Sequence, residues 1–111
     1  MSEIRELNSI GAQVMGDKVV WIGGYPCLFP DVPEGSGYIR FAPATDIGQA
    51  FMVWEKTGIK GKLTWNGKGE YSCWLETLYE WYHADNTALA IMRAVREAVK
   101  EVNHENIDNI N

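Results

Sequence analysis

The spacing of apolar residues predicts an amphipathic helix at each end of the chain. Over Glu3 to Met15, apolar side chains recur every third or fourth position, and Ser2 can act as the N-cap. A longer segment begins after the polar residues 85–87 and carries an apolar stripe up to Val102. Residues 103–111 are polar and lack this stripe. We therefore expect one folded domain over residues 1–102, followed by a disordered tail over 103–111.

A third helix is expected in the middle of the chain. Asp46, with Gln49 three residues later, resembles a capping box, although Thr45 is an alternative N-cap. Lys56 and Gly58 provide the usual cation and glycine at the helix end. Four apolar residues at helical spacing are expected to face the core: Ile47, Ala50, Phe51 and Trp54.

Short β-branched and aromatic segments between the first two helices predict strands. Residues 19–22 and 25–29 flank Gly23 and Gly24, which favour a tight turn. Residues 38–41 can form another short strand, after a glycine- and proline-rich loop. These strands are therefore expected to pair locally.

The clearest strand pattern lies between the second and third helices. Apolar and polar residues alternate over 62–65 and again over 71–75, and Asn66 with Gly67 favours a hairpin turn between them. Residues 79–83 alternate in the same way and predict a further antiparallel strand.

Both faces of the predicted strands carry bulky apolar side chains, so both faces need cover. Three amphipathic helices can supply it, which predicts an α/β fold of the α/β/α sandwich type with a largely antiparallel sheet. Trp65 and Trp74 lie on neighbouring strands and sample both sides of the sheet. Both are expected to be mostly buried.

Composition and charge narrow the function. The chain has 111 residues, of which 46% are hydrophobic, and a net charge of −5. An acidic surface repels phosphate backbones, so nucleic acid is a poor partner, and the broken uncharged run at 19–30 is too short to span a membrane. Cys27 and Cys73 stand alone and are expected to be small buried residues. These features predict a cytoplasmic protein.

No residue pattern in the chain indicates catalysis or a cofactor. His83 and Asp85 could in principle exchange protons, but no nucleophile accompanies them, so a half-buried structural imidazole is the preferred interpretation. Histidines and cysteines are too few and too scattered for a structural zinc site. We expect a protein that is not an enzyme, with no catalytic residue, no metal site and no cofactor.

Two segments resemble a known family. They are Phe-Ala-Pro-Ala-Thr-Asp-Ile with the helix that follows, over residues 41–56, and Ala-Asp-Asn-Thr-Ala-Leu-Ala-Ile with its helix, over residues 84–99. In their order and spacing they are similar to the phage ABA sandwich domain of small phage and prophage proteins. The resemblance implies a sandwich fold and a phage or prophage origin. It implies no activity and no site residue.

An excess of aromatic residues is the remaining signal. The chain contains five Trp, five Tyr and three Phe, and most of them are expected in the core. The candidate binding residues lie in two places. Trp74, Trp81 and Tyr82 belong to an aromatic cluster near the last strand, and Arg40 with its neighbour Tyr38 follows the glycine-rich loop. Non-catalytic binding to a host protein is the favoured function. Binding of a small nucleotide-type ligand is the alternative, and a homo-oligomer remains open.

Overall fold

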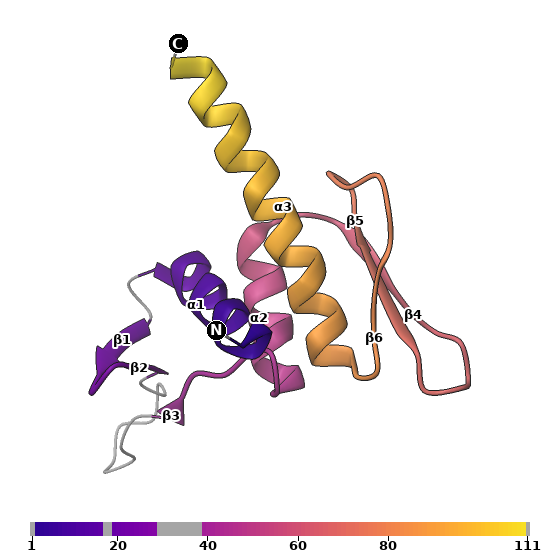
Figure 1. The fold of residues 1–111 in the computed structure, drawn as a ribbon, viewed down its shortest axis with the longest axis horizontal. Coiled ribbons are helices and arrows are strands. Elements are labelled where there is room, and N and C mark those ends of the chain that lie inside the picture. The colour runs from indigo at the N-terminus through magenta and orange to yellow at the C-terminus, as the bar shows by residue number, and fades with distance from the viewer. Residues whose placement is uncertain (1, 17–18, 29–38, 111) are drawn as a thin grey trace.

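The mixed α/β class is confirmed by the computed structural model, which describes residues 2–16, 19–28 and 39–110, with side chains up to residue 100. Within these residues, three α-helices and two antiparallel three-stranded sheets are present (Figure 1). In chain order the elements are α1 (Glu3–Met15), β1 (Val19–Ile22), β2 (Tyr25–Leu28), β3 (Ile39–Arg40), α2 (Ile47–Thr57), β4 (Gly61–Trp65), β5 (Tyr71–Leu75), β6 (Tyr82–Ala84) and α3 (Thr87–Ile110).

The centre of the fold is α3. It contacts α1 and α2 on one side and β5 and β6 on the other (Figure 1). In the first half of α3, buried side chains therefore extend beyond the single apolar stripe that the sequence predicts. The buried residues of this half are Ala88, Leu89, Ala90, Ile91, Met92, Ala94, Val95 and Ala98. The helix continues to Ile110, beyond the end of that stripe at Val102.

Within this α/β sandwich, the strands form two small antiparallel sheets. The N-terminal sheet (β1–β3) lies near α1, and the C-terminal sheet (β4–β6) packs against α3, so the helices lie between two sheets (Figure 1). On the outer face of the C-terminal sheet, Trp74 is covered by Trp81 from the loop between β5 and β6. This face therefore gains apolar cover from its own loop rather than from a helix.

The expectation that Trp65 is buried was wrong. Trp65 is 62% exposed and stacks on Tyr71, with ring centroids 6.3 Å apart. Its strand, β4, is an edge strand, whereas α3 contacts β5 and β6, so the end of β4 lies outside the helical cover. Trp74 is half-buried, and its Nε1 donates to the carbonyl oxygen of Leu78 at 2.9 Å.

The buried side of α2 also differs from the expected one. Gln49, Ala50 and Val53 are buried, whereas Ile47 and Phe51 are exposed. The Gln49 side chain explains this rotation, because its Oε1 accepts from the backbone N–H of residue 42 at 2.6 Å and its Nε2 donates to the carbonyl of residue 40 at 3.2 Å. These bonds hold the polar side of α2 against the chain that precedes it.

The helix caps at Ser2 and Asp46 are confirmed, but Gln49 does not complete a capping box, because its side chain bonds residues 40 and 42. Ser2 accepts from the backbone N–H of Arg5 at 3.2 Å, and Asp46 accepts from that of Gln49 at 2.9 Å. Among the three polar residues 85–87 where α3 begins, the cap is Asn86, whose Oδ1 accepts from the N–H of residue 89 at 2.8 Å. These bonds satisfy backbone donors that no helical carbonyl can reach.

The two tryptophans of the C-terminal sheet are expected to differ in their effect on stability. Trp65→Ala should change the free energy of unfolding by less than about 0.5 kcal/mol, because the side chain is largely in solvent. Trp74→Ala should cost about 2 kcal/mol or more, since it removes apolar contacts and leaves the Leu78 carbonyl without its donor. Urea unfolding of both variants measures the difference, and equal costs would contradict the structure.

Candidate functional site

A cleft with polar and aromatic walls lies between α1 and the N-terminal sheet. Its volume is about 400 Å³. From α1 it is lined by Arg5 and Asn8, and from the sheet by Trp21, Tyr25 and Arg40. The size falls in the range of small-molecule sites.

Two contacts hold Arg40 in this cleft. Its guanidinium carbon lies 3.8 Å from the centroid of the Tyr25 ring, which is a cation–π contact. Its backbone carbonyl is held by Gln49, as described above. Among the described residues, no carboxylate forms an ion pair with Arg40 or with Arg5. Both guanidinium groups can therefore bind an external anion.

A second candidate is the loop between β5 and β6, residues 76–81, which we call the aromatic loop. Tyr79 is fully exposed, and Trp81 is exposed with its ring centroid 6.2 Å from that of Trp74. The loop is held at Leu78, whose N–H donates to the carbonyl of Leu75 at 2.8 Å and whose carbonyl accepts from Trp74. It is thus an ordered platform for exposed rings.

The residues chosen from the sequence fall into two separate places. Arg40 belongs to the cleft, whereas Trp74, Trp81 and Tyr82 belong to the C-terminal sheet on the other side of α3 (Figure 1). Trp74 and Tyr82 are partly buried against the core, so Trp81 is the exposed member of that group. Tyr38 lies outside the described residues.

Four residues of these two surfaces were not among the candidates chosen from the sequence. They are Arg5, Trp21, Tyr25 and Tyr79. Helical spacing already places Arg5 off the apolar stripe of α1, so its exposure could have been found. Strand alternation gives no such signal for the three aromatics, because it cannot tell a buried face from an open one.

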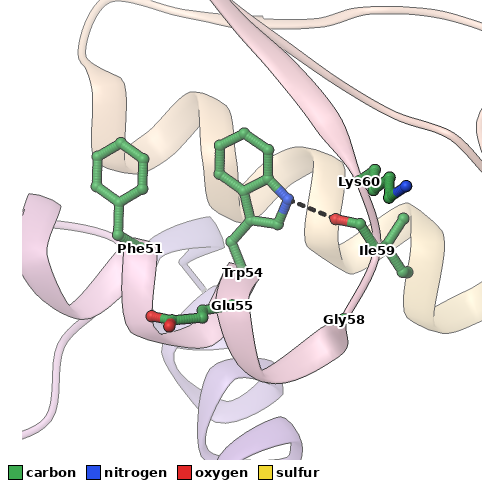
Figure 2. A pocket seen from close by; sticks show the side chains of 6 residues that line it. All are labelled: Phe51, Trp54, Glu55, Gly58, Ile59 and Lys60. Atoms are coloured by element: carbon green, nitrogen blue, oxygen red, sulfur yellow. Dashed lines mark hydrogen bonds between the residues drawn. The ribbon is translucent and has the colours of Figure 1, made fainter.

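A further hollow of about 310 Å³ lies at the end of α2 (Figure 2). Phe51 and Trp54 stand side by side on the helix, with ring centroids 5.8 Å apart, and Trp54 Nε1 donates to the carbonyl of Ile59 at 2.9 Å. Its charged lining groups are Glu55 and Lys60, both exposed. The indole donor is already used, so polar recognition is weaker here than in the cleft.

The histidine near the last strand does not form a catalytic relay. His83 is exposed rather than half-buried, and its Nδ1 lies 2.5 Å from Ser72 Oγ and 4.0 Å from Glu70. In a hydrolase triad the hydroxyl and the carboxylate contact different ring nitrogens. Here both face the same nitrogen. Asp85, the sequence candidate, instead accepts from Asn86 at 3.2 Å.

The cysteines are both free and buried, as expected. Burial raises the pKa of Cys73 to about 12, so its thiol stays protonated at neutral pH and is a poor nucleophile. Cys27 contacts the carbonyl of Tyr25 with its Sγ at 3.6 Å. No group of three or more histidine, cysteine or acidic side chains that could hold a metal is found among the described residues.

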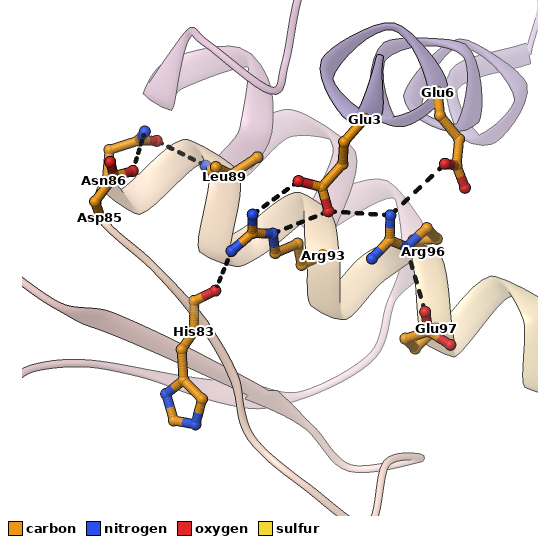
Figure 3. A network of polar contacts seen from close by, with 9 residues as sticks. All are labelled: Glu3, Glu6, His83, Asp85, Asn86, Leu89, Arg93, Arg96 and Glu97. Carbon is orange, nitrogen blue, oxygen red and sulfur yellow. Dashed lines mark hydrogen bonds and ion pairs between the residues drawn. The ribbon is translucent and has the colours of Figure 1, made fainter. Parts of the chain in front are cut away.

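An ion-pair network joins the start of α1 to α3 (Figure 3). Glu3 binds Arg93 through both carboxylate oxygens, at 2.7 and 3.1 Å, and Arg96 at 3.2 Å. Arg93 also donates to the carbonyl of His83 at 2.6 Å, so one guanidinium connects α1, α3 and β6. The hydrogen bonds from Arg93 lower the pKa of Glu3 below its usual 4.5.

Comparisons with known proteins assign the chain to no family. No family model, no curated protein and no solved structure matches the chain. In the described part of the chain, no helix has the length and apolar character needed to cross a membrane.

The network predicts a pH-dependent stability. Because the pKa of Glu3 is lower when folded, its contribution is present above the unfolded value of 4.5 and is lost as the pH falls through the lower folded value. At neutral pH, Glu3→Gln should cost about 1 kcal/mol, a modest figure because the carboxylate is 36% exposed.

Urea unfolding from pH 7 down to pH 3 measures this contribution. The stability gap between wild type and Glu3→Gln should narrow below pH 4.5. Glu80→Gln removes an exposed carboxylate outside the network and serves as the control. A gap that stays constant over this range would contradict the ion pair.

Proposed function

We propose that the protein acts by non-catalytic binding to another protein, and that the aromatic loop makes the central contact. The observation that supports this most directly is the exposure of Tyr79 and Trp81 on one ordered loop. An aromatic side chain fully in water contributes little to folding, whereas exposed aromatic rings gathered on one loop are typical of an interaction site. Tyr and Trp are the side chains that most often dominate protein interfaces.

The order of the loop favours binding. Trp74 and Leu75 hold Leu78 through two hydrogen bonds, and the Trp74 ring supports that of Trp81. A loop that is already ordered loses less conformational entropy when a partner binds. Trp74 therefore acts as a positioning residue, while Tyr79 and Trp81 make the contact.

The charge of the loop indicates the kind of partner. Glu76 precedes the exposed rings and Glu80 lies between them in the chain. Both carboxylates are exposed, and the whole chain carries a net charge of −5. A partner with a basic surface around an apolar pocket would match this pattern, and its association rate would fall as salt increases.

The origin of the partner follows from the sequence resemblance. Similarity to the phage ABA sandwich domain supports a phage or prophage protein, whose partner is then a protein of the bacterial host. The site would act in the host cytoplasm. This binding function requires no cofactor.

Affinity capture from a bacterial lysate, with partners identified by mass, tests this proposal. Wild type should retain a host protein that Tyr79→Ser and Trp81→Ser lose, whereas Trp65→Ser should retain it as the matched control, since Trp65 is exposed elsewhere on the same sheet. With the purified partner, either loop variant should bind about thirtyfold more weakly, because an interface hot spot contributes about 2 kcal/mol.

Two results would overturn the proposal. One is recovery of the bait alone from lysates in which it is folded. The other is recovery of the same proteins by wild type and by both loop variants. Tyr79→Ser keeps the test free of folding effects, because the side chain that it removes lies wholly in solvent.

A further inference from the structure

The cleft between α1 and the N-terminal sheet points to a second function. We propose that it binds a nucleoside phosphate, independently of the aromatic loop. The phosphate would lie between Arg5 and Arg40, and the base would stack on one of the two aromatic side chains that line the cleft, Trp21 and Tyr25, which we call its aromatic wall.

The charge balance of the chain makes the two arginines unusual. Fifteen acidic residues outnumber ten basic ones, so the chain has enough carboxylates to pair with every arginine. The other described arginines, Arg93 and Arg96, do bind carboxylates. In the cleft, neither Arg5 nor Arg40 has such a partner among the described residues. Two unneutralised guanidinium groups in one cavity favour an anionic ligand.

The contact between Arg40 and Tyr25 leaves room for a phosphate. The guanidinium carbon lies over the Tyr25 ring, 3.8 Å from its centroid, so the ring approaches the guanidinium from one side. A planar guanidinium that stacks by its face still presents its N–H groups at the edge, where they can bind two phosphate oxygens. The stacking thus orients the donor group instead of blocking it.

The remaining walls suit the nucleoside. Trp21 and Tyr25 are 54% and 53% exposed, although both belong to strands, so a planar base has rings on which to stack. Asn8 adds a fixed polar group, because its Oδ1 accepts from the N–H of Ala44 at 2.9 Å. That bond orients its amide nitrogen, which has no partner among the described residues, as a donor to a ligand.

The test is isothermal titration of the full chain with the four ribonucleoside monophosphates, with inorganic phosphate and with the four unphosphorylated nucleosides. At least one monophosphate should bind more tightly than both its nucleoside and phosphate alone. Arg5→Gln and Arg40→Gln should each weaken this binding about tenfold or more, which corresponds to about 1.4 kcal/mol. Lys68→Gln removes a cation in the β4–β5 turn and should leave the binding unchanged.

Several results would overturn the proposal or part of it. Absence of binding by every monophosphate at millimolar concentration would overturn it, and so would binding that both arginine variants retain. Equal binding of inorganic phosphate would overturn the role of the aromatic wall. The Arg5 side chain forms no hydrogen bond or ion pair among the described residues, so Arg5→Gln removes no polar contact from the fold. Tyr79→Ser should bind normally, which separates this proposal from the first.

Discussion

The burial of α3 on two sides is the constraint on which the rest of the structure depends. Helices α1 and α2 pack on one side of it and β5 and β6 on the other. Small residues make this possible, because alanines at positions 90, 94 and 98 let neighbouring elements approach closely. Gly11 of α1 has the same role, since a Cβ there would lie 2.7 Å from the Pro43 side chain and 3.2 Å from that of Met92.

This central helix also separates the two candidate surfaces. The cleft lies where α1 meets the N-terminal sheet, and the aromatic loop belongs to the C-terminal sheet beyond α3. Arg93 links the two sides, because it binds Glu3 at the start of α1 and the carbonyl of His83 in β6. The two surfaces therefore share a scaffold while they differ in chemistry, one carrying arginines and the other carboxylates.

Features set by neighbouring residues could be predicted from the sequence. The caps at Ser2 and Asp46, the glycine turn after β1 and the hairpin between β4 and β5 depend on contacts within a few residues. Gly61 shows the limit of such reasoning. A Cβ there would collide with the carbonyl oxygen of Trp74, a constraint that becomes visible only once β4 and β5 are paired.

Features set by distant contacts could not be predicted in this way. The exposure of Trp65 depends on how far α3 reaches across the sheet, and the rotation of α2 depends on where Gln49 finds its partners. Helical spacing pairs Arg93 with Glu97, yet the structure joins Arg93 to Glu3, ninety positions away in the chain. For the site, the sequence pattern identified Arg40 but could not show that Arg5 lines the same cleft.

Native-state hydrogen exchange, followed residue by residue, tests the central role of α3 most directly. If the fold is built around this helix, amides of residues 91–98 should exchange only through global unfolding, with the full free energy of unfolding. Amides of β1 and β2, whose sheet meets the helices chiefly through α1, should exchange through local openings of lower free energy. Protection in β1 and β2 that equals or exceeds that of α3 would contradict this account.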